Sequence, residues 1–292
     1  MAAEGTRTTH IIAIGNQKGG VGKTTTTVHL ARALAELGRR VLIFDLDANH
    51  GATNHFAIPD SYLGTYEVLL GSETPESVLL TRDSEEEITL PENVDIIPAN
   101  RRLENIEGAL REKDKMMEPH RVLLEPLQSL RGVYDYVLLD TAPNASIPTI
   151  ATYKAAEWFI LAALPETFAI QGLAEALSDI LAVRKHGNPG IRVLGVAICN
   201  ADKRTRLSKQ LLDYVEEQFM VEGVSRKFDT VIPRSTVVSA AQKLGKTVFE
   251  TEPDHKVTQA YRALAREVEG RLAAVRTSDG QQQVRGGMVQ NA

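Results

Sequence analysis

The feature that most constrains the fold of this chain is a loop rich in glycine and lysine near its start. The loop, Lys18-Gly19-Gly20-Val21-Gly22-Lys23-Thr24-Thr25, follows the apolar run Ile11–Ile14 and precedes a helical pattern over Thr25–Leu37. A strand, such a loop and a helix in this order are typical of a P-loop, in which backbone N–H groups and the helix N-terminus hold phosphate oxygens. The sequence therefore predicts a nucleotide-binding α/β domain.

The side chains of this loop suit a nucleoside triphosphate with a magnesium ion. Lys23 is placed to neutralise the β- and γ-phosphates, and the hydroxyl of Thr24 is placed to bind Mg²⁺. We therefore predict ATP and Mg²⁺ as cofactors. The predicted cofactor-binding residues of the loop are Lys18, Gly19, Gly20, Val21, Gly22, Lys23, Thr24 and Thr25.

The start of the loop departs from the common pattern G-x-x-x-x-G-K-[ST]. Gln17 stands where the first glycine is expected, and Lys18 adds a second ammonium group before Lys23. One lysine is sufficient to neutralise a γ-phosphate, so Lys18 needs a separate explanation. Either it is a solvated loop lysine, or it points away from its own pocket toward a phosphate held by a second subunit.

Along the rest of the chain, short apolar runs alternate with longer helical patterns. Runs of consecutive Val, Ile and Leu are typical of strands buried on both faces of a parallel sheet. The predicted strands are Ile11–Ile14, Val41–Phe44, Val94–Ile97, Tyr136–Leu139, Phe159–Leu164, Val193–Ile198 and Val231–Ile232, and the predicted helices are Thr25–Leu37, His120–Leu130, Phe168–His186, Leu207–Phe219 and Val257–Val275. This alternation predicts a doubly wound, mostly parallel sheet with helices on both faces, in a single domain over residues 1–276.

Two segments interrupt the alternation. Residues 71–92 are acidic, with Asp83-Ser84-Glu85-Glu86-Glu87 at their centre, and we interpret them as a solvated insertion between strands. Residues 277–292 are rich in Gly and Gln and have no core pattern, so we predict a disordered C-terminal tail.

The overall composition excludes several classes of protein. The net charge of −5 does not indicate a globally basic nucleic-acid binder, and the single cysteine, Cys199, excludes an internal disulfide framework or a multi-cysteine metal site. No apolar run reaches the roughly 18 residues that span a bilayer, and the first residues lack a signal-peptide pattern. The apolar stripe of Val257–Val275 is typical of a packing face. We therefore expect a cytoplasmic protein without a membrane partner.

The loop resembles the deviant Walker A motif, K-G-G-x-G-K-[ST], of the ParA/MinD family. The resemblance extends from Ile11 to about Val275. Residues 40–47 are similar to the second strand and the start of switch I of that family, residues 134–143 to its Walker B strand, and residues 230–234 and 245–247 to its C-terminal landmarks. The resemblance implies a P-loop NTPase of the SIMIBI type. It also implies that Lys18 reaches across a nucleotide-sandwich dimer to the phosphates of the partner.

The carboxylates at the ends of two predicted strands fit this chemistry. Asp45 and Asp47 are two positions apart at the carboxyl end of a strand that we expect next to the P-loop strand. α/β sheets bind ligands at such ends, and alternation places both side chains on one side of the strand. The resemblance implies that Asp47 orients or activates the attacking water, and that Asp45 acts near Mg²⁺. It also implies that Asp140 holds Mg²⁺ directly or through water. By resemblance, the catalytic residues are Lys18, Lys23 and Asp47, the metal site is Thr24, Asp45 and Asp140, and the adenine contacts lie near Pro233 and Arg234.

Switch I departs from the family pattern. Ala48-Asn49-His50-Gly51-Ala52-Thr53 stands in place of Pro-Gln-Gly-Asn-Ala-Thr, and Ala142-Pro143 in place of Pro-Pro. These changes bear on the hydrolysis rate and the switch geometry more than on nucleotide binding. We interpret His50 as a solvated loop histidine.

A basic cluster at the start of a late helix is the candidate DNA-binding surface. Basic groups at a helix N-terminus oppose the helix dipole, so helix stability does not explain the four that fall within residues 203–209. Arg204 matches the arginine of the family motif Asp-x-Arg-Thr, and the predicted DNA-binding residues are Arg204, Arg206 and Lys209. A second family arginine is Val237 here, so Arg226, Lys227 and Lys243 are further candidates.

Together these features resemble a short, Soj-like chromosomal ParA. The resemblance implies a slow, partner-stimulated ATPase that acts as a dimeric switch in partitioning a chromosome or plasmid. The ATP-bound homodimer would bind non-specific DNA of the nucleoid, and a ParB-like partner would release it. No helix-turn-helix segment precedes the P-loop, so operator binding is not expected. Two alternatives stay open: a ParA-like ATPase that positions a protein cargo, such as a microcompartment or chemoreceptor cluster, and a DNA-independent regulatory ATPase.

Overall fold

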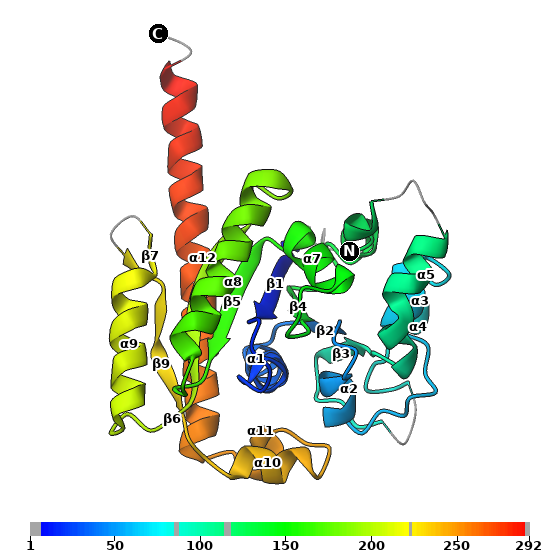
Figure 1. Cartoon of the computed structure of the whole chain (residues 1–292), viewed down its shortest axis with the longest axis horizontal. Coiled ribbons are helices and arrows are strands. Elements are labelled where there is room, and N and C mark those ends of the chain that lie inside the picture. The colour runs from blue at the N-terminus through cyan, green and yellow to red at the C-terminus, as the bar shows by residue number, and fades with distance from the viewer. Residues whose placement is uncertain (1–6, 85–87, 114–117, 222–223, 290–292) are drawn as a thin grey trace, which may run out of the picture.

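A seven-stranded parallel sheet forms the centre of the computed structural model, which describes residues 7–84, 88–113, 118–221 and 224–289 (Figure 1). The strand order is β3-β2-β4-β1-β5-β6-β9, so β4 lies between β2 and β1, and the expectation that the strand of Asp45 is next to the P-loop strand is wrong. The strands are β1 (His10–Gly15), β2 (Val41–Asp45), β3 (Val94–Ile97), β4 (Tyr136–Asp140), β5 (Trp158–Ala163), β6 (Arg192–Ala201) and β9 (Lys227–Pro233). Two short strands, β7 (Met220–Val221) and β8 (Val224–Ser225), form a separate antiparallel pair. All seven strand predictions are confirmed.

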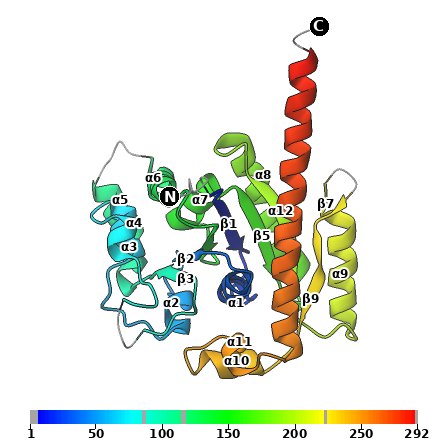
Figure 2. The ribbon, with the colours of Figure 1, turned by 180° about the vertical axis from the view of Figure 1, so that it is seen from behind.

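Helices cover both faces of the sheet, as the sequence predicts. Alternate residues of β1 belong to different cores: Ile11 belongs to the core that includes residues of α7, α8 and α9, and Ile12 to the core that includes residues of α1 and α12. Figures 1 and 2, seen from opposite sides, show α8 and α12 on the two faces of the sheet. The helices are α1 (Lys23–Glu36), α2 (Gly51–His55), α3 (Thr65–Leu70), α4 (Pro75–Val78), α5 (Ile106–Lys113), α6 (Leu124–Ser129), α7 (Ile147–Ala155), α8 (Ala169–His186), α9 (Arg206–Gln218), α10 (Val237–Gln242), α11 (Val248–Thr251) and α12 (Lys256–Val289), with two 3₁₀ turns at Arg101–Asn105 and Pro119–Arg121.

The long helices correspond to the predicted ones, whereas the sequence analysis does not identify most of the short ones. The apolar stripe of α12 is confirmed as a packing face, because Tyr261, Leu264 and Val268 are buried. The short helices α2, α3, α4, α10 and α11 span four to six residues each. One or two turns are too few for a helical period to emerge from the sequence.

The acidic segment 71–92 is more closely packed than predicted. It includes α4, and Leu80 forms an antiparallel bridge with Ile96 of β3. Leu80, Ile88 and Leu90 are buried. The interpretation as a wholly solvated insertion is therefore wrong for these apolar side chains, which reach the core between the charged positions. Residues 85–87, in its acidic centre, lie outside the described residues.

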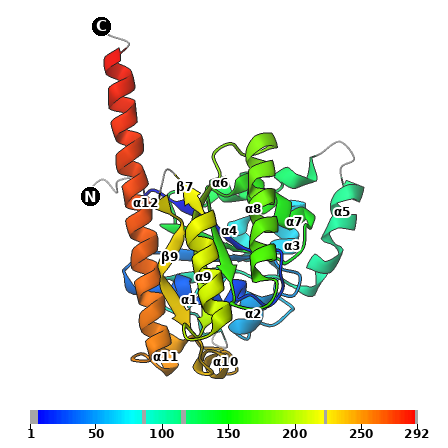
Figure 3. The ribbon, with the colours of Figure 1, turned by 60° about the vertical axis from the view of Figure 1, so that its left-hand side comes forward.

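The C-terminal helix extends beyond the sheet. Figure 3 shows α12 projecting past the body of the molecule, and its backbone is helical to Val289. This differs from the predicted disordered tail over residues 277–292. No proline interrupts residues 256–289, so the backbone hydrogen-bond ladder can continue past the last packed turn.

The carboxyl ends of the central strands meet at one edge and position the candidate site. In the register of the sheet, Asp45 of β2 lies opposite Asp140 of β4, and Ile14 of β1 lies opposite Asp140 on its other side. The loop that follows β1 therefore starts beside two carboxylates.

Candidate nucleotide-binding site

The loop between β1 and α1 forms a preorganised phosphate cradle. Gly20 and Gly22 have φ angles of 72° and 89°, which glycine adopts without strain. The side chain of Asn16 fixes the start of the loop, because its Oδ1 accepts from the backbone N–H of Lys18 (3.0 Å) and its Nδ2 donates to the carbonyl of Ala162 (2.8 Å). A cavity of about 280 Å³ is lined by Gly19, Gly20, Gly22, Lys23, Thr24, Thr25, Asp47, Asn49 and Pro143. Val21 is buried beside it.

The two lysines of the loop lie in different surroundings. Lys23 is 6% exposed, and its Nζ donates to the carbonyl of Lys18 (3.2 Å). Burial lowers its pKa, although the nearby carboxylates of Asp140 and Asp47 oppose this shift. The Nζ of Lys18 instead contacts Glu166 Oε2 (3.2 Å) and the carbonyl of Thr167 (3.1 Å), just before α8. Only Lys23 therefore lines its own phosphate cavity.

Asp140 has the properties of a cation ligand. It is fully buried, its Oδ1 accepts from the hydroxyl of Thr27 (3.1 Å), and its Oδ2 has no hydrogen-bond partner among the described residues. Burial raises its pKa to about 8, the carboxylate of Asp45 adds to the shift, and the hydroxyl of Thr24 opposes it. A buried carboxylate oxygen without a donor fits a bound cation, which would replace the missing partner.

A magnesium ion beside Thr24 and Asp140 would need few protein ligands. Among the described residues, no three His, Cys, Asp or Glu side chains are arranged to hold a metal ion. Mg²⁺ commonly keeps several waters and is bound by one or two protein oxygens together with substrate phosphates. Thr24 and Asp140 are sufficient for such a site.

Asp45 and Asp47 face different neighbours. The Oδ2 of Asp45 accepts from both the backbone N–H (2.9 Å) and the hydroxyl (2.7 Å) of Thr53 on α2. Burial raises the pKa of Asp45 to about 6 despite these bonds. Asp47 lines the phosphate cavity and accepts from the backbone and side chain of Asn49 (2.9 Å each). Asp47 therefore lines the cavity, whereas Asp45 faces Thr53 on α2.

Pro233 and Arg234 lie at the far end of the same edge. The end of β6 packs on the phosphate loop, where a Cβ on Gly22 would lie 3.4 Å from the Cβ of Cys199. Pro233 pairs with Ala201, and the backbone N–H of Arg234 donates to the Ala201 carbonyl (3.0 Å). A cavity of about 500 Å³ is lined by Ala201, Asp202, Lys203, Arg204, Val231, Pro233, Arg234 and Lys256.

The predicted DNA-binding residues lie on the surface beside this second cavity. The guanidinium of Arg204 forms two hydrogen bonds with the carboxylate of Asp202 (2.9 and 2.7 Å), which holds the pKa of that carboxyl well below its usual range. Arg206 and Lys209 are exposed on the first turn of α9. Lys227 pairs with Glu216 (2.9 Å).

Three polar residues of the site are not predicted from the sequence. Asn16 shapes the loop, Thr27 holds Asp140, and Thr53 holds Asp45. The only available signal is their proximity in sequence to the glycine-rich loop or the paired aspartates. Asn and Thr are common loop and helix residues, so this signal is weak.

Known proteins resemble this chain over most of its length. The AAA domain family matches residues 9–193. The chromosome-partitioning ATPase Soj of Thermus thermophilus is 37% identical over 262 residues, which cover 89% of this chain and 96% of that protein. The chromosome partitioning protein ParA of Caulobacter vibrioides is 35% identical over 260 residues, covering 88% and 93% of the two chains.

The chain belongs to the ParA/MinD family. Solved structures agree with this assignment. The septum site-determining protein MinD of Pyrococcus horikoshii, complexed with Mg-ADP, has a TM-score of 0.72 and 26% identity, covering 91% of this chain and 98% of that one. The cobyrinic acid a,c-diamide synthase of Mycobacterium smegmatis, with bound ADP and magnesium, has a TM-score of 0.71 and 30% identity, covering 88% and 92%.

This member of the ParA/MinD family is an ATPase of the ParA type that uses ATP and Mg²⁺. The predictions of family, fold class, enzyme class and cofactors are confirmed. Within the described part of the chain, none of the helices is both long enough and apolar enough to cross a membrane.

Proposed function

We propose that this protein is an ATP-dependent dimeric switch for DNA partitioning. In this proposal the ATP-bound dimer binds non-specific DNA of the nucleoid, and a ParB-like partner stimulates slow hydrolysis and releases it. The observation that carries the proposal is the separation of the two loop lysines. Lys23 is turned into its own phosphate cavity, whereas Lys18 points out of it toward Glu166. An ammonium group displayed at the rim of a phosphate site suits a second phosphate group supplied by another subunit.

The residues of the cavity have distinct roles in this proposal. Lys23 neutralises charge on the β- and γ-phosphates, and Asp47 orients the attacking water from the cavity wall. Thr24 and Asp140 would hold Mg²⁺, which supplies electrostatic stabilisation of the phosphates when bound. Asp45 acts indirectly, by holding α2 through Thr53. Pro233 and Arg234 would contact the base from the β6–β9 edge.

The proposed DNA contact lies outside the nucleotide cavity. Arg204, Arg206 and Lys209 project from the start of α9, where they can meet the regularly spaced phosphates of a duplex. The Soj and ParA proteins that this chain resembles are chromosome-partitioning proteins, which supports DNA as the cargo.

The proposed dimer is tested with two substitutions at the contact between Lys18 and Glu166, which should have opposite effects on dimerisation. Lys18→Ala should abolish ATP-induced dimerisation and hydrolysis while retaining nucleotide binding. Glu166→Gln should favour the dimer, because it removes the carboxylate that holds Lys18 within its own chain. Mass photometry with a non-hydrolysed ATP analogue measures both. Normal ATP-dependent dimers from Lys18→Ala would refute the cross-subunit role.

The DNA part of the proposal is tested by binding assays at two salt concentrations. ATP-loaded protein should bind duplexes of unrelated sequence, with an affinity that falls steeply as salt rises. ATPase activity should increase when DNA and the genetically neighbouring protein are both added. If ATP-loaded protein shows no salt-sensitive DNA binding, a protein cargo or a purely regulatory ATPase becomes the better explanation.

A further inference from the structure

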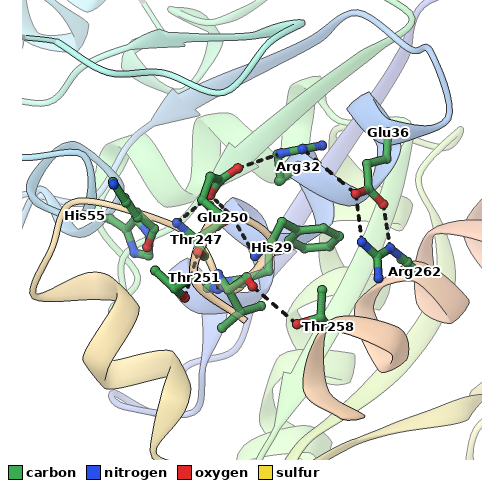
Figure 4. Close-up of polar contacts among 12 residues, drawn as sticks. His29, Arg32, Glu36, His55, Thr247, Glu250, Thr251, Thr258 and Arg262 are labelled. Carbon is green, nitrogen blue, oxygen red and sulfur yellow. Dashed lines mark hydrogen bonds and ion pairs between the residues drawn. The ribbon is translucent and has the colours of Figure 1, made fainter. Parts of the chain in front are cut away.

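Two buried histidines hold one short backbone segment between them. His29 lies on α1 and His55 on α2, with perpendicular rings whose centroids are 5.6 Å apart. The Nε2–H of His55 donates to the carbonyl of Lys246 (3.0 Å), and the backbone N–H of Val248 donates to His29 Nε2 (3.4 Å). Figure 4 shows both rings close to Thr247, which lies between these two backbone contacts.

The roles of the two rings are fixed by their surroundings. Burial lowers the pKa of His29 to about 3 and that of His55 to about 4, so both rings are neutral near pH 7. A neutral imidazole has one donor and one acceptor nitrogen. His29 contacts the carbonyl of Thr25 through Nδ1 (2.8 Å), which leaves Nε2 as the acceptor for the Val248 amide. The segment is therefore bonded to one acceptor on α1 and one donor on α2.

The α1 side of this arrangement is firmly attached. Arg32 of α1 pairs with Glu250 of α11 (2.8 Å), and Glu36 of α1 pairs with Arg262 of α12 (2.6 Å), as Figure 4 shows. Thr247 also caps α11 and bonds to Glu250. The C-terminal helices are thus tied to the helix that follows the phosphate loop.

The α2 side is attached to the nucleotide site instead. Thr53 donates twice to Asp45, and Gly51 packs so closely on Thr24 that an added Cβ would lie 2.9 Å from its hydroxyl oxygen. α2 contains only five residues. His55 therefore lies about half a helical turn from Thr53 on the same short helix.

An exposed basic turn directly precedes Thr247 in the chain and includes Lys246, whose carbonyl bonds to His55. Lys243 and Lys246 are exposed on either side of Leu244, which is 66% exposed. Within this turn, a Cβ added at Gly245 would lie 3.6 Å from the Cβ of Ala57, two residues after the end of α2. The hydrogen bond to His55 is made by the backbone of Lys246 itself, so the position of one of these lysines depends on α2.

We propose that His55 is a positioning residue that couples occupancy of the phosphate site to the turn Lys243–Lys246, and that this turn is a further contact for DNA phosphates. The inference rests on the proposed DNA binding for its second part. Because α2 contacts Asp45 through Thr53 and Thr24 through Gly51, a shift of α2 in the nucleotide-bound state would carry the Lys246 carbonyl with His55. The two lysines then reach a position that favours the polyanion in the ATP state only.

Four variants test the coupling. His55→Leu replaces the imidazole with an apolar side chain and so removes the donor to the Lys246 carbonyl. His55→Gln restores an amide N–H at the same number of bonds from Cβ as Nε2, whereas His55→Asn places its amide one bond short. Thr258→Val is the matched control, because the buried Thr258 hydroxyl donates to the carbonyls of Glu252 (2.6 Å) and Val248 (3.4 Å) on the α11 side of the same segment and therefore tests a hydrogen bond that does not come from α2.

Two measurements are made on each variant, with ADP and with a non-hydrolysed ATP analogue. The first is backbone hydrogen exchange over residues 243–249, and the second is affinity for a duplex of arbitrary sequence. In the wild type, DNA affinity should differ between the two nucleotides by about fivefold or more, as expected for an allosteric coupling. His55→Leu and His55→Asn should bring that ratio close to one and remove the nucleotide-dependent change in exchange. His55→Gln and Thr258→Val should retain both.

The outcomes separate this inference from the proposed function. If His55→Leu keeps the wild-type ratio, or Thr258→Val loses it equally, the coupling through His55 is refuted and DNA binding stands. If no form of the protein binds DNA, the proposed function fails, and the exchange data alone decide the coupling. Should His55→Leu not fold, the Asn and Gln variants provide the same comparison, since they differ by one methylene group.

Discussion

The charged side chains at the two ends of the carboxyl edge of the sheet differ in their exposure to solvent. Beneath the phosphate loop, Lys23 and Asp140 are buried, and the fold itself sets their positions. At the β6–β9 end, the side chain of Arg204 is 89% exposed and is paired with Asp202 two residues away. Charges of the first kind cannot change partners without moving the core, whereas an exposed ion pair exchanges partners at little cost. The comparison therefore predicts a rigid catalytic end and an adaptable binding end.

The largest effect is expected for Lys23→Ala, at the buried end. Removing a preorganised charge from a dry phosphate site should lower kcat by about 10²–10³-fold. Phosphate-release kinetics measure it. Lys203→Ala, an exposed lysine at the other end, is the control and should retain the wild-type rate. Equal losses in the two variants would remove the distinction between the two ends.

A smaller effect is expected for Arg204→Ala, on the proposed DNA contact. Loss of one phosphate contact should reduce the slope of log affinity against log salt by about one, with no dependence on sequence. Fluorescence anisotropy at several salt concentrations measures the slope. The control is Lys185→Ala, an exposed basic residue in the last turn of α8, which should leave the slope unchanged. An unchanged slope in Arg204→Ala would exclude this arginine from the interface.

An effect in the opposite direction is expected for Asp202→Asn. The substitution removes the charge that holds Arg204 within its own chain. Since exposed ion pairs are weak, affinity for DNA should rise only about twofold to fivefold. The same anisotropy assay measures it. If the double variant Asp202→Asn/Arg204→Ala gains affinity as well, the gain reflects net charge and not release of the arginine.

The smallest effect is expected from pH, at the buried end. Burial raises the pKa of Asp140 from 3.8 to about 8, so the folded protein binds a proton that the unfolded chain has released. This contribution to the free energy of unfolding is complete below about pH 4 and is lost as pH rises through about 8. Without Mg²⁺ and nucleotide, Tm should therefore fall by a few degrees between about pH 6.5 and 8.5.

Differential scanning fluorimetry checks this pH dependence. Asp140→Asn should flatten the dependence, because its amide does not ionise, and Mg²⁺ with ATP should reverse it by stabilising the ionised carboxylate. An equally steep decline in Asp140→Asn would assign the pH dependence to another group.

The sequence by itself determined the sheet and the phosphate loop. The strand β2 is apolar from Val41 to Phe44 because both of its faces are covered, and such a run can be recognised in the sequence without knowledge of its neighbours. The loop from Lys18 to Thr25 is contiguous, so its glycines, lysines and threonine give a complete local signal. The placement of Asp45 and Asp140 at the ligand-binding edge follows from their positions at the carboxyl ends of predicted parallel strands, whereas their direct pairing depends on a strand order that the sequence does not give.

Only the tertiary structure decided what each polar group faces. Asp45 and Asp47 are two residues apart and similar in sequence context. Yet Asp45 accepts a hydrogen bond from Thr53, whereas Asp47 lines the phosphate cavity. The contacts of Lys18 with Glu166, and of His55 with Lys246, join residues 148 and 191 positions apart. The short helix α2 is too short to show a period of its own, and its buried residues Ala52, Thr53 and His55 pack within the folded protein. Long-range hydrogen bonds depend on distances that the chain acquires only when the sheet and both helix layers are assembled, so no local pattern encodes them.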